Sequence, residues 1–228
     1  MALPKMLSLT QANNLRPEVR EALEMCRQWD YQYDSAQVGP SIFEEWWRQF
    51  NDTLWDEMQG LRHPTRFTTL RVLTEGKAPA YVDNRNTNGI EDLQTLVTAS
   101  FKEAYQHLMQ KHGAAGKQWN WGRVKHTTIQ HLAKIPGLGV PFISCNGAKN
   151  VVNATDTDNG PSWRMVVEMS KKPKGYGIIP GGQSGNPGSP NYSRGVEKWR
   201  LGQLDALISY DYQASTYPGL REMIILTP

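Results

Sequence analysis

The segment IIPGGQSGNPGSPNYSRGVEKW, residues 178–199, is the most distinctive part of this sequence. Its centre, residues 181–190, consists almost entirely of residues that form turns. A phosphate-binding P-loop needs the pattern GxxxxGK followed by Ser or Thr, but here Pro187 precedes Gly188 and no lysine follows. Two prolines and a pair of adjacent glycines fix particular backbone angles, which argues against a flexible linker. The segment therefore predicts a fixed, packed loop.

The composition around this loop is that of a globular protein. The chain has 228 residues, of which 39% are hydrophobic and 21% are charged, and it contains eight tryptophans and nine tyrosines. A net charge of +3 is too small to indicate a nucleic-acid or membrane-surface partner. The basic run Lys171–Lys174 is typical of a solvated turn, and no apolar run approaches the roughly 18 residues of a membrane span.

The sequence contains no metal or cofactor motif. Histidines 107 and 112, and again 126 and 131, are five positions apart, which places the members of each pair on different faces of a helix. The acidic stretch Asp156–Gly160 lacks the closing glutamate of an EF-hand. Cys26 and Cys145 have no CxxC spacing, so we expect two free thiols, although one disulfide is the alternative.

The first half of the chain predicts helices. Arg16–Glu18 opens the first helix with a proline and an acid. Ser41–Glu44 matches a capping box, and apolar side chains then recur every three or four positions: Phe43, Trp46, Trp47, Phe50, Leu54, Trp55 and Met58. A further helix is predicted from about Glu91 to His112, ending at Gly113. The intervening residues 77–92 predict a loop.

The second half predicts short strands at 151–155, 163–169, 177–179 and 223–226. Asn159-Gly160 predicts a tight hairpin between the first two, and residues 203–208 predict a short helix. The fold class is therefore α+β, with a mainly helical segment 1–118 and a β-rich segment 119–228. Standing alone, these strands would leave an apolar face and open edges, so we expect them to belong to a larger sheet.

Several motifs resemble the carboxy-terminal end of the β-subunit in the penicillin acylase family. They are GPSWRMVVEM (160–169), PGGQSGNPGSPNY (180–192), VVNAT (151–155) and WNWGRVKHTTIQH (119–131), with weaker support from residues 23–34 and 41–58. Two stretches depart from the family pattern. Asn191–Arg194 replaces a His-Tyr pair followed by acids, and Asn146–Lys149 replaces a Gly-Asp-Gly run. These departures bear on substrate specificity.

The resemblance implies an αββα N-terminal-nucleophile hydrolase, of which this chain is a carboxy-terminal piece. In that family the amino-terminal serine of the β-subunit attacks an amide, its own α-amine acts as the base, and an asparagine helps to hold the oxyanion. Residue 1 here is methionine, while Ser8 and Thr10 follow a helical pattern. We therefore expect no catalytic residue in this chain, and the glycine-rich loop to be a structural signature.

The resemblance also suggests what surrounds the chain. It implies a parent amidohydrolase acting on penicillin or related β-lactam side chains, or on acyl-homoserine lactones, and exported to the periplasm or secreted. The amino terminus, MALPKMLSLTQ, has no secretion-signal layout, so we expect the precursor to begin upstream. The partners implied are the α-subunit and the amino-terminal part of the β-subunit, with self-association of the isolated chain as an alternative. No cofactor is expected in this chain, since the family's calcium is bound by upstream residues.

Glu168 is the one candidate for a supporting role in the reaction. In some branches of the family a late-strand carboxylate supports a histidine near the nucleophile, and Glu168 in MVVEM is the nearest match. The alternative is a charge at the solvent end of a strand, or a partner for Arg164 or Lys171. A different function class also stays open: a non-catalytic binding or assembly module that presents Trp46, Trp47 and Trp55 to a partner.

Overall fold

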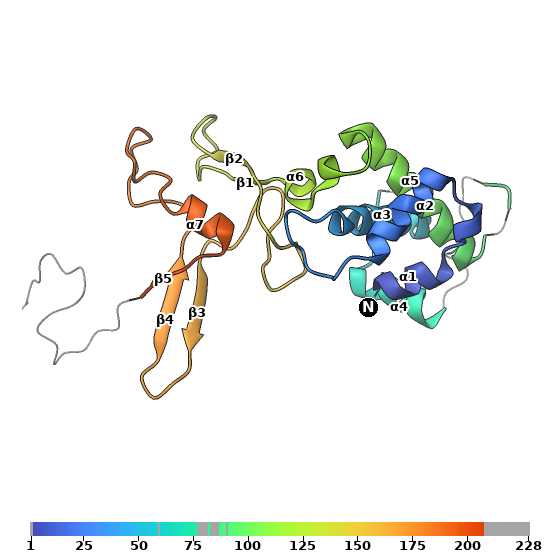
Figure 1. Ribbon diagram of the computed structural model, residues 1–228, viewed down its shortest axis with the longest axis horizontal. Coiled ribbons are helices and arrows are strands. Elements are labelled where there is room, and N and C mark those ends of the chain that lie inside the picture. The colour runs from blue at the N-terminus through green and yellow to red at the C-terminus, as the bar shows by residue number, and fades with distance from the viewer. Residues whose placement is uncertain (1, 59, 77–81, 83–86, 90, 208–228) are drawn as a thin grey trace, which may run out of the picture.

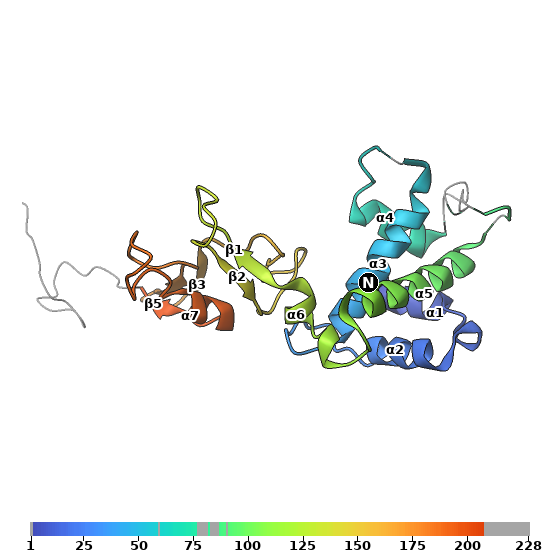
Figure 2. The ribbon, with the colours of Figure 1, turned by 90° about the horizontal axis from the view of Figure 1, so that it is seen from above.

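The computed structural model describes residues 2–58, 60–76, 82, 87–89 and 91–207. Within them, helices come first and antiparallel strands follow, which confirms the predicted α+β class. Figure 1 shows the large helices gathered at one end of the molecule and the strands at the other, with the short helix α6 between them. The view from above in Figure 2 shows the same separation. The division into segments 1–118 and 119–228 stays a prediction.

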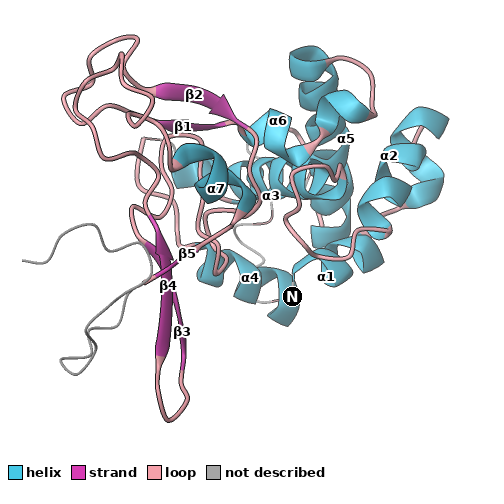
Figure 3. Cartoon of the chain, turned by 60° about the vertical axis from the view of Figure 1, so that its left-hand side comes forward, coloured by secondary structure: helices cyan, strands magenta, loops and turns pink. Residues whose placement is uncertain are grey.

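The secondary structure is drawn by type in Figure 3. The α-helices are α1 (Ala2–Leu9), α2 (Pro17–Arg27), α3 (Gly39–Leu54), α4 (Arg66–Glu75), α5 (Leu93–His112), α6 (Trp121–Lys125) and α7 (Val196–Leu201). The strands are β1 (Thr127–Ile129), β2 (Val140–Ile143), β3 (Arg164–Glu168), β4 (Lys174–Ile178) and β5 (Asp205–Ala206).

Two of the predicted helices are confirmed at their ends. Helix α2 begins at Pro17, where the missing N–H of proline costs nothing because first-turn donors have no partner within the helix. Helix α5 begins after Asp92, whose carboxylate accepts a hydrogen bond from the Thr95 N–H at 2.7 Å. It ends at Gly113, whose φ of 80° favours glycine. Local sequence is therefore sufficient to set these ends.

The predicted capping box at Ser41 is wrong. Helix α3 already begins at Gly39, so Ser41 lies inside the helix and is buried, with only 1% of its surface exposed. The earlier start follows from tertiary packing, because a Cβ at residue 39 would lie 2.4 Å from the Trp29 Cβ. Glycine lets the helix begin against this indole, and Pro40 fits in its first turn.

The tryptophans of α3 form the core of the helical part. Trp46 is fully buried, and its indole N–H donates to the Val97 carbonyl at 3.0 Å on helix α5. Its ring meets Phe101 edge to face, with centroids 4.8 Å apart. Trp47 and Trp55 are 5% and 3% exposed. The hypothesis that these tryptophans are presented to a partner is therefore wrong, since they pack inside this chain.

Several elements have no counterpart in the sequence-based prediction. Two of them are helices: α6, and α4, which starts after Thr65, whose hydroxyl accepts from the Thr68 N–H. Strands β1 and β2 are also unpredicted, and they form a two-stranded antiparallel sheet. Both are short, and β2, Val-Pro-Phe-Ile, contains a proline, which argues against a strand, so the sequence pattern does not reveal them. Most of the loop predicted at 77–92 lies outside the described residues.

The strands predicted at 163–169 and 177–179 are confirmed as β3 and β4. They pair antiparallel from Arg164 opposite Ile178 to Glu168 opposite Lys174, and β5 adds to the other side of β4. Much of this three-stranded sheet is exposed: Met165, Val166 and Val167 keep 54%, 55% and 41% of their surface accessible. The basic run is exposed, as predicted: Lys171 and Lys172 lie in the connection of the β3–β4 hairpin, and Lys174 begins β4.

The strand predicted at Val151–Thr155 is wrong. This segment forms bends, and the Ala148 N–H donates to the Asn153 carbonyl across a local turn. Consequently no hairpin forms at Asn159-Gly160; instead the Asp156 N–H donates to the Asn159 carbonyl at 2.8 Å within a short loop. The apolar pattern misleads here because the segment wraps around the buried Lys125, which donates to the Thr155 hydroxyl.

The helix predicted at 203–208 is also wrong within its described part. The helix of this region, α7, lies earlier and stops at Gly202, whose φ is 72°. Asp205 and Ala206 then pair with β4 as β5. Glycine in a left-handed conformation ends the helix before the apolar residues that prompted the prediction. The strand predicted at 223–226 lies outside the described residues.

Both cysteines are buried free thiols, as predicted. Burial in the helical core raises the pKa of Cys26 from 9.0 to about 12, with Arg27 opposing the shift. The unfolded chain loses this proton at lower pH than the folded chain. The protonated Cys26 thiol therefore contributes to the free energy of unfolding. This contribution is fully present below pH 9.0 and is lost as the pH rises toward about 12, by up to ~1.4 kcal/mol per pH unit.

This expectation is tested by urea unfolding of the wild type and Cys26→Ala between about pH 8 and pH 11. Other groups also titrate in this range, so the difference between the two proteins is the relevant quantity. The stability advantage of the wild type should shrink as the pH rises. Parallel curves would show that the buried thiol contributes nothing to the alkaline loss of stability.

Candidate functional site

The glycine loop, residues 180–195, closes at its base through two backbone hydrogen bonds. The Gln183 N–H donates to the Asn191 carbonyl at 3.0 Å, and the Gly195 N–H donates to the Gly181 carbonyl at 2.8 Å. Glycine is required where the two ends of the loop meet, because a Cβ at residue 182 would lie 1.8 Å from the Asn191 carbonyl oxygen. The base of the loop is therefore fixed, as the sequence predicts.

The far end of the loop has a different character. Residues 185–188 are exposed, and the Asn186 side chain accepts from the Gly188 N–H in a local turn. Between tip and base, the Tyr192 hydroxyl donates to the Leu138 carbonyl at 2.7 Å, which ties the loop to the segment that precedes β2. The loop thus anchors several late segments while its tip faces solvent.

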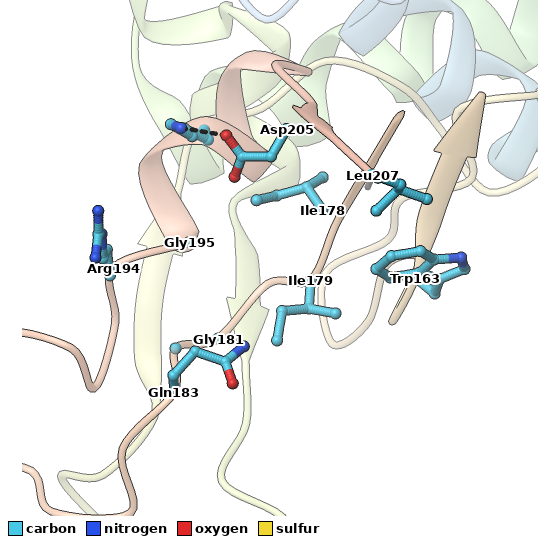
Figure 4. A pocket seen from close by; sticks show the side chains of 12 residues that line it. Trp163, Ile178, Ile179, Gly181, Gln183, Arg194, Gly195, Asp205 and Leu207 are labelled. Atoms are coloured by element: carbon cyan, nitrogen blue, oxygen red, sulfur yellow. Dashed lines mark hydrogen bonds and ion pairs between the residues drawn. The ribbon is translucent and has the colours of Figure 1, made fainter. Parts of the chain in front are cut away.

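The base of the loop forms one wall of a cavity of about 450 Å³. Figure 4 shows Trp163, Ile179 and Leu207 among the side chains around it. Its polar groups are Gln183, Arg194 and an ion pair between Lys198 and Asp205. Its remaining lining residues are Gly177, Ile178, Gly181, Gly182 and Gly195.

This lining suits binding or packing better than chemistry. It contains no serine, threonine, cysteine or histidine among the described residues, and its lysine is already paired with Asp205. The indole of Trp163 lies so close to Gly177 that a Cβ there would come within 2.5 Å of the ring. An apolar wall with exposed aromatic surface is typical of a place where another segment packs.

Lys125 is the second organising centre, and the sequence analysis missed it. It is 5% exposed, and its ammonium donates to the carbonyls of Cys145 and Gly147, each at 3.0 Å, and to the Thr155 hydroxyl at 2.5 Å. The Trp121 ring lies 5.6 Å from the same nitrogen. Burial lowers the pKa of Lys125. One sequence signal pointed to it: a lysine four positions after a tryptophan shares that residue's helix face.

Arg164 joins β3 to α7 and to the loop before it. Its guanidinium donates to the Trp199 carbonyl at 2.6 Å and to the Asn153 side-chain oxygen at 2.9 Å. It also lies 5.2 Å from the Trp199 ring centroid. Arg164 is therefore engaged here and is not the partner of Glu168.

Glu168 lies at the exposed end of β3, opposite Lys174 in the hairpin. Among the described residues, Glu168 therefore lines no part of the glycine-loop cavity and contacts no histidine. The histidines predicted to be ordinary polar residues include His107, whose Nδ1 lies 2.9 Å from a Glu45 oxygen. Among the described residues, no cluster of three or more His, Cys, Asp or Glu side chains is suited to a metal.

Residues 1–215 match the family model described as penicillin amidase. Two similar relatives are acyl-homoserine lactone acylases named QuiP. The protein from Pseudomonas fluorescens is 29% identical over 60% of this chain, and that from Pseudomonas syringae pv. tomato is 30% identical over 54%. The aligned region covers 17% of either relative's length, so this chain matches a small part of each.

A thermostable penicillin G acylase from Alcaligenes faecalis superposes with a TM-score of 0.53, at 16% identity, over 99% of this chain and 46% of that chain. None of the helices within the described residues is long and apolar enough to cross a membrane. The fold likeness agrees with the expected N-terminal-nucleophile hydrolase architecture, and the family match runs through both the helical part and the glycine loop. The chain belongs to the penicillin amidase family.

Proposed function

We propose that this chain is the carboxy-terminal part of the β-subunit of an amidohydrolase that cleaves acyl amide bonds. The observation that carries the proposal is the family match over residues 1–215, which includes the glycine loop. The role of this chain is to complete the fold. The segments after residue 119 are held together by the base of the glycine loop, by Lys125 and by Arg164. The cavity beside the loop offers a surface on which another segment can pack.

The substrates we propose are N-acyl-homoserine lactones, followed by penicillin and related β-lactam side-chain amides. Similarity to acylases that act on acyl-homoserine lactones supports the first class. The reacting groups would lie upstream: an amino-terminal serine as nucleophile, its own α-amine as base, and an oxyanion hole. The proposal includes export to the periplasm, and no cofactor held by this chain.

The upstream polypeptide is the partner we propose for the three-stranded sheet. Strand β3 pairs with β4 on one side only, within the described residues, and Met165, Val166 and Val167 are exposed. Burying such side chains contributes about 1.5–3 kcal/mol each. We propose that upstream strands cover them, and that the isolated chain self-associates in their absence. In the assembled protein, Glu168 is proposed to support the catalytic site if the upstream chain covers the end of β3.

The test compares this chain alone with the chain produced together with its upstream reading frame. The chain alone should release no homoserine lactone from an acyl-homoserine lactone and should not cleave a phenylacetyl amide. The complete protein should do so, and replacing its serine at the self-cleavage junction should abolish turnover. Turnover by the chain alone, or a complete protein inert toward all acyl amides, would contradict the proposal.

The role of Glu168 is tested in the same complete protein. If the carboxylate supports the reaction, Glu168→Gln should lower kcat by about tenfold or more, since positioned acid–base groups contribute about 10²–10⁴-fold. Glu197→Gln is the matched control, because Glu197 is an exposed acid that pairs with Arg200 on α7. Equal kcat values for the two variants would leave Glu168 as a surface charge.

A further inference from the structure

A thiol and an amine meet inside the β-rich part of the molecule. The Lys125 Nζ lies 3.6 Å from the Cys145 Sγ, and the two residues are 5% and 3% exposed. They come from different elements: Lys125 ends α6, while Cys145 follows β2. The thiol is also oriented from its other side, where it donates to the Thr127 hydroxyl at 3.3 Å.

We propose that Lys125 and Cys145 are a modification site, at which peroxide joins the lysine nitrogen to the cysteine sulfur through one bridging oxygen atom. The inference is independent of the proposed amidohydrolase activity. It rests on the contact between the two side chains and on the way their surroundings hold them.

The surroundings fix both reacting atoms. The Lys125 nitrogen is held by the carbonyls of Cys145 and Gly147 and by the Thr155 hydroxyl, so it stays beside the sulfur. A direct S–N bond would require the Lys125 nitrogen and the Cys145 sulfur to move much closer together than their present 3.6 Å. A bridging oxygen occupies part of the gap and needs a smaller shift, which the packed loop around residues 145–147 tolerates more easily.

The chemistry balances with two molecules of hydrogen peroxide. The first oxidises the thiol to a sulfenic acid and leaves one water. In the second step, the sulfenic oxygen bonds to the lysine nitrogen while the second peroxide accepts two electrons and leaves as two waters. The sulfenic acid loses one hydrogen and the amine loses one hydrogen to these waters. The lysine reacts as the free amine, and burial favours this form by lowering its pKa.

Peroxide can reach Lys125 from solvent, and the second thiol of the chain, Cys26, serves as a control at which no bridge should form. Lys125 forms part of the wall of a polar crevice of about 550 Å³, which also includes Val124 and Thr157. Hydrogen peroxide is close to water in size and can enter such a space. The other thiol, Cys26, lies in the hydrophobic core of the helical part. Its oxidation should give simple oxygen adducts.

The test is peptide mapping by mass spectrometry after mild peroxide treatment of the full chain. The expected product joins the peptides that contain residues 125 and 145, with a gain of one oxygen atom and a loss of two hydrogen atoms. A thiol reductant should reverse it. Cys26→Ser should retain the product and Cys145→Ser should lose it. The wild-type map alone decides the question if a variant fails to fold.

Three results would overturn the proposal. The first is Cys145 carrying only simple oxygen adducts, with Lys125 unmodified. The second is a cross-link between other residues in place of this pair. The third is an unchanged Cys145 under conditions that fully oxidise exposed methionines such as Met169, which is 85% exposed.

Discussion

Replacing Lys125 by methionine should lower the free energy of unfolding by about 1–3 kcal/mol, the cost of leaving a buried acceptor without its donor. Methionine has a similar length and no branch, so the change removes mainly the ammonium. The Cys145 carbonyl then loses this donor inside the protein, while the Gly147 carbonyl keeps the Trp121 indole N–H at 2.7 Å and the Thr155 hydroxyl keeps its bond to the Asn146 carbonyl. Each buried polar group without a partner costs about 1–3 kcal/mol, partly offset because no charge has to be buried.

The measurement is urea unfolding followed by tryptophan fluorescence, to which Trp121 beside the lysine contributes. Lys149→Met is the matched control, since this lysine is 76% exposed and its pairing with Asp156 spans 3.6 Å. The control should change stability by no more than about 0.5 kcal/mol. A loss below about 1 kcal/mol for Lys125→Met would show that the ammonium does not organise this part of the fold.

Replacing Gly182 by alanine should destabilise the protein by about 3 kcal/mol, at the upper end of the usual cost of overpacking. The added Cβ would lie 1.8 Å from the Asn191 oxygen and 2.7 Å from the Tyr192 oxygen. Both atoms belong to the backbone, so no side-chain rotation relieves the overlap. The base of the loop must open, which breaks the hydrogen bond from the Gln183 N–H to Asn191.

Gly181→Ala provides the control for this prediction. No atom lies within 4 Å of the position that its Cβ would take, so stability should change by no more than about 0.5 kcal/mol. Urea unfolding measures the difference, and limited proteolysis reports whether the loop opens. Equal stability of the two variants would mean that the loop base is not closed in solution as described.

Several features of the fold could be read from the sequence because their causes are local. Proline in a first turn and a glycine after a last turn act through residues a few positions apart, so the sequence predicts the start of α2 and the approximate ends of α5. The glycine loop is similar, since its turn residues restrict the backbone wherever the loop is placed. The family resemblance rests on the same loop and on β3.

Other features were decided by contacts between residues distant in sequence. The start of α3 depends on Trp29 packing against Gly39, which overrides the capping pattern at Ser41. Residues 151–155 have the composition of a strand, yet they bend because Thr155 turns toward a lysine that lies thirty positions earlier. Strands β1 and β2 form only because the chain returns to pair with itself.

The sequence by itself therefore determined the helix ends with local caps, the closed glycine loop and the family. The tertiary structure alone decided that Lys125 is buried, that Cys145 lies against it and that Arg164 serves α7 instead of Glu168. The physical reason is the range of the forces involved. Caps and turns are satisfied within a few residues, whereas a buried charge takes its partners from wherever the fold brings carbonyls and hydroxyls together.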